Sequence, residues 1–192
     1  MKCPIIKRCG GCFYPQDQYQ EELKEKTLFI EKEVQKAKLK IEVKPTVASP
    51  LVNGYRNKVI VAFNQKYEYG LYEEHSQDII PYKHCLLHED IMDEILQYIQ
   101  SYLRKYRVSI YDRRRHKGLL RHVLIRRGVK TDQTMVVLVC NENMWRGSKQ
   151  FCSQLVKRFP SIKTIVLNVN TRKTPIVLGN KDKVLYGKGF IV

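Results

Sequence analysis

The chain has 192 residues, and its 35 Lys and Arg outnumber 19 Asp and Glu, which gives a formal net charge of +16 at pH 7. Hydrophobic residues make up 43% and aromatic residues 10%, which excludes a disordered chain and predicts one sizeable domain with appendages. The positive charge favours a polyanionic partner, above all nucleic acid, and no apolar run approaches the roughly 20 residues of a membrane span.

Cysteines dominate the amino-terminal stretch. The first dozen residues lack the apolar core of a signal peptide, so we expect a cytoplasmic protein, in which grouped cysteines more often bind metal than form disulfides. Four thiolates suit either zinc or an iron–sulfur cluster, and His84 and His88 leave a zinc site with one imidazole open. Cys140 and Cys152 are expected to be core thiols. The candidate metal ligands are Cys3, Cys9, Cys12 and Cys85.

The spacing of apolar residues predicts an α+β fold, with a mostly antiparallel sheet, two to three flanking helices and an amino-terminal cysteine-rich loop. Residues 189–192 look like the start of a strand, which makes the end of the chain look cut. Helices are predicted at 16–39, 88–106 and 147–159. Strands are predicted at 55–63, 67–72, 79–81, 119–127, 134–140, 162–169 and 184–186.

A basic segment, residues 101–130, contains eleven Lys and Arg and the single acid Asp112. Guanidinium groups bind phosphates and stack on unpaired bases, which favours single-stranded or looped RNA over a duplex; a solvated charged loop is the alternative. No glycine-rich nucleotide motif, nucleophile elbow or paired carboxylates stand out, so we predict no catalytic residue. The candidate RNA-binding residues are Arg56, Lys58, Arg113, Arg114, Arg115, His116, Lys117, Arg121 and Arg126.

Several segments together resemble the amino-terminal and central parts of the RNA (uracil-5-)-methyltransferase family, especially its 23S rRNA branch. They are Cys3…Cys9-Gly10-Gly11-Cys12, Gln18-Tyr19-Gln20, Gly54-Tyr55-Arg56-Asn57-Lys58, Tyr82-Lys83-His84-Cys85, the stretch from Gly118 to Arg126, and Asn168-Val169-Asn170. The resemblance implies a [4Fe–4S] cluster on the four cysteines, with zinc as the alternative. It also implies that S-adenosylmethionine gives a methyl group to C5 of a uracil in a loop or single-stranded region of 23S rRNA, after a cysteine attacks C6.

The sequence departs from the family's pattern because it shows neither the methyl-donor site nor the catalytic motif. The resemblance therefore implies a cluster-binding loop at 1–15, a long helix and linker at 16–50 that would pack on a missing catalytic domain, and a central RNA-binding domain at 51–192. We expect such a chain to be inactive alone, with no residue of its own for S-adenosylmethionine. The alternatives are a stand-alone zinc- or cluster-stabilised RNA-binding module and, as the weakest, a ferredoxin-type electron carrier.

Overall fold

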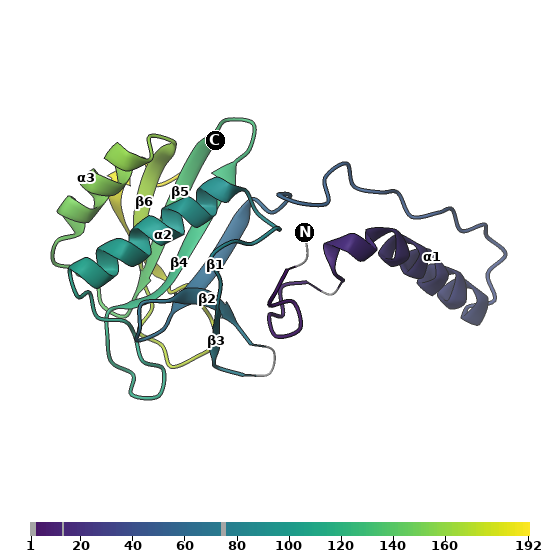
Figure 1. The fold of residues 1–192 in the computed structure, drawn as a ribbon, viewed down its shortest axis with the longest axis horizontal. Coiled ribbons are helices and arrows are strands. Elements are labelled where there is room, and N and C mark those ends of the chain that lie inside the picture. The colour runs from purple at the N-terminus through teal and green to yellow at the C-terminus, as the bar shows by residue number, and fades with distance from the viewer. Residues whose placement is uncertain (1–2, 13, 74–75) are drawn as a thin grey trace.

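The computed structural model describes residues 3–12, 14–73 and 76–192. In these ranges the fold is α+β, as predicted, with a seven-stranded sheet in the order β3-β2-β1-β4-β5-β6-β7. Only β5 and β6 pair in parallel, joined by a crossover through α3, and every other neighbouring pair is antiparallel. Helices α2 and α3 cover one face of the sheet, whereas α1 extends away from it (Figure 1).

The predicted helices and strands are present with small shifts in their ends. The helices are α1 (Tyr19–Lys36), which follows a short 3-10 turn, α2 (Asp90–Lys105) and α3 (Ser148–Arg158). The strands are β1 (Lys58–Phe63), β2 (Tyr69–Tyr72), β3 (Ile79–Pro81), β4 (Leu120–Gly128), β5 (Gln133–Cys140), β6 (Ile162–Val169) and β7 (Lys181–Gly187). Every helix in the described ranges is too short or too polar to cross a lipid bilayer.

The prediction of a strand at residues 189–192 is wrong. Gly187 and Gly189 have φ angles of +76° and +86°, a conformation that bends the chain out of the extended path of β7. The last residue instead lies beside the β4–β5 turn, where the Val192 amide donates to Gln133 Oε1 at 3.1 Å and Thr131 donates to the Val192 carbonyl.

The main core lies between the sheet and α2 and α3. Helix α2 places Ile95, Ile99 and Leu103 on one face at helical spacing, and all three are fully buried. They pack against inward-facing strand residues such as Ile125 and Leu138. A smaller apolar group, centred on Leu124, Val137, Val139 and Val166, lies on the opposite face of the sheet.

A β-bulge interrupts the start of β4. The pairing with β5 shifts between Leu120 and His122, so one extra residue is inserted into β4. Leu120 and Val123 both belong to the helix-covered core, and Arg121 and His122 between them do not. The bulge thus directs two consecutive polar side chains away from the helix-covered core.

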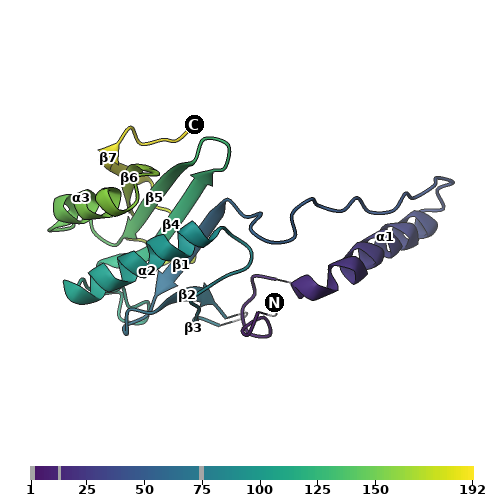
Figure 2. The same cartoon turned by 45° about the horizontal axis from the view of Figure 1, so that its top comes forward.

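Helix α1 and the following linker form an arm outside the sheet (Figures 1 and 2). The linker runs back along the helix, because the Thr46 amide donates to Thr27 Oγ1 at 2.9 Å and the Ser49 amide donates to the Tyr19 hydroxyl at 2.7 Å. None of the described side chains of α1 is buried, and Leu28, Phe29 and Ile30 are 51%, 62% and 48% exposed. The arm therefore presents apolar side chains that the sheet does not cover.

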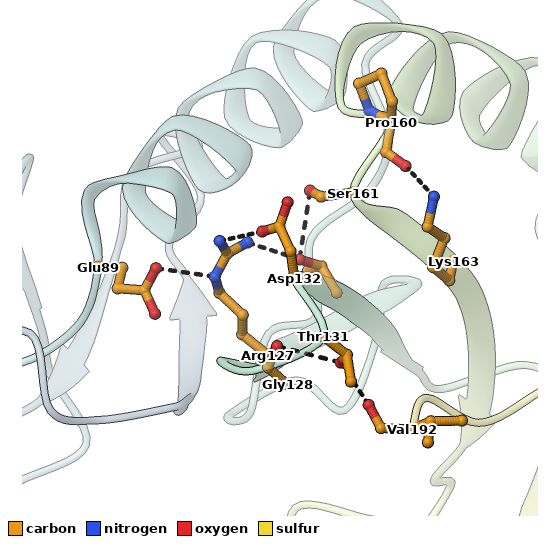
Figure 3. A network of polar contacts seen from close by, with 10 residues as sticks. Glu89, Arg127, Gly128, Thr131, Asp132, Pro160, Ser161, Lys163 and Val192 are labelled. Atoms are coloured by element: carbon orange, nitrogen blue, oxygen red, sulfur yellow. Dashed lines mark hydrogen bonds and ion pairs between the residues drawn. The ribbon is translucent and has the colours of Figure 1, made fainter.

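Arg127 joins three elements at the other end of β4 (Figure 3). Its Nε lies 2.9 Å from Glu89 Oε2, its Nη2 pairs with Asp132, and its Nη1 donates to Thr134 Oγ1 at 3.4 Å. Arg127 therefore fixes the β4–β5 hairpin to the start of α2, although it belongs to the basic segment.

Candidate metal centre and nucleic-acid interface

The cysteine-rich loop is attached to the sheet by its backbone and by two arginines. Cys9 forms an isolated antiparallel bridge with Glu73, just after β2. Arg8 Nε donates to Glu73 Oε1 at 2.9 Å, and Arg56 Nη2 donates to the Gly11 carbonyl at 2.8 Å. Arg56, predicted to bind RNA, therefore also holds this loop in place.

The other three predicted ligands lie close enough to Cys9 to affect its thiol electrostatically. Burial raises the pKa of the Cys9 thiol, a backbone hydrogen bond from Gly11 opposes this, and Cys85, Cys12 and Cys3 each raise the pKa further. Coulomb effects weaken with distance, so Cys85 has returned close to the amino-terminal cysteines. All four cysteines are half-buried.

The donor set fits a thiolate-bound centre in its chemistry. The neighbouring cysteines raise the pKa of the Cys9 thiol, and a bound cation would reverse this effect by stabilising the thiolate. Gly11 gives the loop room to turn, since a Cβ there would lie 3.2 Å from Cys9 Sγ. In the described ranges no group of three or more His, Cys, Asp or Glu side chains has the spacing of a coordinated metal, so the thiols are gathered without preformed coordination geometry.

Cys85 is positioned by a buried carboxylate on α2. The Cys85 amide donates to Asp93 Oδ2 at 3.0 Å, and His88 Nε2 lies 2.8 Å from Asp93 Oδ1. Burial alone lowers the pKa of His88, but hydrogen bonds to Asp93 and Cys85 outweigh it and raise the pKa to about 9. His84 Nδ1 is 3.3 Å from Asp93 Oδ2. Both histidines are alternatives as zinc ligands on the sequence, and in this structure they contact Asp93.

We expect Asp93→Asn to lower the free energy of unfolding by about 3 kcal/mol, because it leaves the buried His88 imidazolium without its anion. Urea unfolding of the 192-residue protein measures this change. Asp90→Asn is the matched control, since Asp90 is exposed and lies 3.4 Å from His84; we expect its effect to stay below about 1 kcal/mol. Equal losses in the two variants would contradict the role given to Asp93.

The predicted RNA-binding residues 113–117 form a tight loop between α2 and β4. Asp112 Oδ1 accepts the amides of Arg114 and Arg115 at 2.8 and 3.0 Å, which lowers the pKa of Asp112 and keeps it anionic. Gly118 closes the loop with a φ of +108°, and a Cβ there would lie 2.2 Å from the Ile110 carbonyl oxygen. The exposed side chains of this loop are Arg114, Arg115, His116 and Lys117, and Arg113 is half-buried.

Two of the other predicted basic residues lie away from this loop. Lys58 and Arg126 are cross-strand partners on the sheet face away from the helices. Arg126 is five residues from Arg121 along β4, about 17 Å at the usual rise per residue. The cationic residues predicted as one surface are therefore divided between the two ends of β4.

Arg121 is buried in the sheet, with only 5% of the residue exposed. Its Nη1 donates to the carbonyls of Asn170 and Arg172, both at 2.8 Å, and its guanidinium carbon lies 4.3 Å from the centre of the Tyr111 ring. His122 is 7% exposed, and its Nε2 is 3.1 Å from the Tyr72 hydroxyl. Burial, with Arg121 and Arg113 nearby, lowers the pKa of His122 to about 4.

His122 should make stability fall in mild acid. Its folded pKa is about 4 and its ordinary value is 6.5, so between these values the unfolded chain binds the proton. The free energy of unfolding should therefore fall by roughly 3 kcal/mol from this residue as the pH drops from about 7 to about 4. Urea unfolding at both pH values measures the loss. His122→Gln should lose less than the unaltered protein, whereas His116→Gln, at an exposed site, should match it; equal losses in all three would contradict this assignment.

Sequence reasoning missed the supporting residues of both sites. Asp93 lies in a helix of ordinary composition, and its contact with His88, five residues earlier and outside the helix, has no marker in the sequence. Tyr72 and Lys173 also escaped notice, because they approach the basic loop only through the sheet and a distant turn. Cys140 and Cys152 are buried core thiols, as predicted, and burial raises their pKa to about 12 and about 11.

Comparison with other proteins gives consistent matches over nearly the whole chain. No family model matches. The chain is 31% identical over 98% of its length to an uncharacterized RNA methyltransferase of Caldanaerobacter subterraneus subsp. tengcongensis, covering 43% of that protein. It is 32% identical to proteins described in the same words from Clostridium tetani, over 99% of the chain, and Bacillus cereus, over 98%, covering 42% of each. The chain thus spans about two fifths of the length of these relatives.

A solved structure with the same fold is the Pyrococcus abyssi tRNA (uracil-54, C5)-methyltransferase in complex with S-adenosyl-L-homocysteine. The two superpose with a TM-score of 0.71 at 22% sequence identity, over 90% of this chain and 40% of the archaeal one. At this identity the likeness establishes the fold.

Proposed function

We propose that these 192 residues are the RNA-recognising part of an S-adenosylmethionine-dependent RNA (uracil-5-)-methyltransferase that acts on a loop or single-stranded region of 23S rRNA. The observation that carries the proposal is the similarity over 98–99% of the chain to proteins named RNA methyltransferases. The exposed basic loop at 113–117 supports an RNA partner, because Asp112 fixes the backbone of Arg114 and Arg115 and so preorganises the loop that presents their guanidinium groups to phosphates.

Each part of the chain has a role in this proposal. Residues 1–15 bind a [4Fe–4S] cluster, residues 51–192 hold RNA, and residues 16–50 pack on a catalytic domain. The exposed Leu28, Phe29 and Ile30 of α1 support that last assignment, since apolar groups gathered on an otherwise charged helix favour a protein contact. We assign no catalytic residue and no S-adenosylmethionine contact to this chain.

The proposed cluster ligands are Cys3, Cys9, Cys12 and Cys85. Bound there, the cluster would supply a covalent tie between the amino-terminal loop and the start of α2. Asp93 would orient the Cys85 backbone, and Arg56 and Glu73 would hold the loop from the sheet side. The second candidate, a zinc-stabilised RNA-binding module without catalysis, is supported by the same thiols and by His84 beside Cys85.

Anaerobic purification distinguishes the two centres. We expect a broad absorption band near ~400 nm with about four iron and four sulfide per chain, as thiolate-bound cubane clusters give. Cys85→Ser should lose most of the iron, whereas Cys152→Ser, a change at a buried core thiol, should keep it. A colourless protein with one bound zinc would contradict the cluster and favour the second candidate, the zinc-stabilised module.

RNA binding tests the basic loop. Arg114→Gln with Arg115→Gln should weaken binding of a fluorescein-labelled single-stranded rRNA fragment and reduce the slope of log affinity against log salt by about 1.4, the loss expected for two phosphate contacts.

Lys149→Gln with Lys157→Gln is the matched control, because it removes the same charge from exposed positions on α3. If both pairs of substitutions weakened binding equally, RNA affinity would depend on the net positive charge of the protein and not on this loop. Methyl transfer from S-adenosylmethionine to the fragment by the 192-residue protein alone would contradict the assignment of catalysis to another domain.

A further inference from the structure

Two adjoining cavities lie where the basic loop meets the sheet. The first, of about 270 Å³, reaches Phe63, Tyr72 and His122, and the second, of about 380 Å³, reaches His116 and Lys173. Five residues line both: Gln77, Tyr111, Arg113, Arg114 and Arg121. The cavities therefore adjoin along shared walls, so that one ligand can span both, and the exposed Arg114 of the basic loop belongs to each.

Aromatic rings and guanidinium groups alternate along this site. The guanidinium carbon of Arg113 lies 5.3 Å from the centre of the Tyr72 ring, and that of Arg121 lies 4.3 Å from the centre of the Tyr111 ring. Such pairs offer flat surfaces against which a nucleobase can stack. A site built only for an inorganic anion has no use for them.

Two buried polar atoms of the site lack a partner among the described residues. Arg121 Nε and His122 Nδ1 are both buried and make no hydrogen bond. A buried polar group without a partner costs about 1–3 kcal/mol, so two in adjacent residues call for an explanation. The β4 bulge places both residues at the wall of the first cavity. A ligand with hydrogen-bonding edges would account for them.

The charge differs between the two cavities. His122 is neutral at physiological pH, because burial lowers its pKa to about 4. The second cavity gathers Arg113, Arg114 and Lys173, and no acid lines it among the described residues. Two acids, Asp78 and Asp112, line the first cavity, where they offset the charge of its arginines, and Asp112 also accepts the amides of Arg114 and Arg115. An uncharged aromatic group suits the first cavity, and a phosphate suits the second.

We propose that the two cavities bind one unstacked nucleotide of an RNA strand, with its base against Tyr72 and His122 and its phosphate at Arg113, Arg114 and Lys173. This inference rests on the proposed function and makes the RNA contact specific. The inference assigns nucleotide binding, and no chemical step, to the residues of these cavities.

Ribonucleoside 3′,5′-bisphosphates are the smallest probes of such a site. Each of the four is titrated into the 192-residue protein, with the Tyr ring and His122 imidazole signals followed by NMR. Ribose 3′,5′-bisphosphate, which lacks the base, and inorganic phosphate serve as reference ligands. At least one nucleotide should shift the Tyr72 and His122 signals and bind about tenfold more tightly than either reference, the gain expected from one stacked base.

Two variants test the residues. Tyr72→Ala should reduce nucleotide affinity about tenfold. Arg113→Gln should weaken binding without removing a ring from the sheet, which keeps the test valid if Tyr72→Ala does not fold. Tyr186→Ala is the matched control, since Tyr186 is 42% exposed on β7 at the far edge of the sheet; it should bind as the unaltered protein does.

The outcomes separate this inference from the proposed function. Equal binding of the nucleotides and inorganic phosphate would show an anion site and overturn the inference. The inference would also fail if the protein bound the rRNA fragment but no nucleotide shifted the Tyr72 and His122 signals. The proposed RNA recognition would not be affected by that result. If the fragment did not bind at all, the proposed function would fail with it.

Discussion

The return of the chain from residues 3–12 to Cys85 is the constraint on which this molecule depends. Bringing four cysteines together closes a long loop, and such closure has an entropic cost that local contacts must offset. Here the contacts are distributed: Glu73 and Arg56 hold the amino-terminal loop, while Asp93 holds the backbone of Cys85. Arg56 precedes β1, Glu73 follows β2 and Asp93 lies in α2, so the cysteine site forms only when these parts of the sheet domain are folded.

The β4 strand connects the core to the basic loop and the two cavities. Its apolar residues Leu120, Val123 and Ile125 pack under the helices, and the bulge between the first two turns Arg121 and His122 away from that core. A regular strand would have sent one of them into apolar surroundings. The cost of burying them is partly offset by the Asn170 and Arg172 carbonyls and by the Tyr72 hydroxyl. The irregularity of the strand is therefore what builds the cavity wall.

Periodicity was sufficient to predict the helices, most strands and the α+β class, because burial on one face imposes a fixed repeat on the sequence. It could not show that Arg121 is buried, since a lone Arg between apolar residues looks the same when it points outward. Nor could it separate Arg126 from the basic loop, because residues close in sequence lie far apart along an extended strand. The wrong strand at 189–192 followed from composition alone, which does not record the positive φ angles of Gly187 and Gly189.

The two sites meet at consecutive residues. Tyr72, the last residue of β2, lines the first cavity and bonds His122, while Glu73 binds the Arg8 side chain and bridges to Cys9. β2 lies next to the edge strand β3, and a short strand there is held by few ladder bonds. Fixing residues 3–12 against Glu73 therefore also limits the positions open to the Tyr72 ring. In this arrangement the cysteine loop influences the proposed nucleotide site through β2, the strand that it holds.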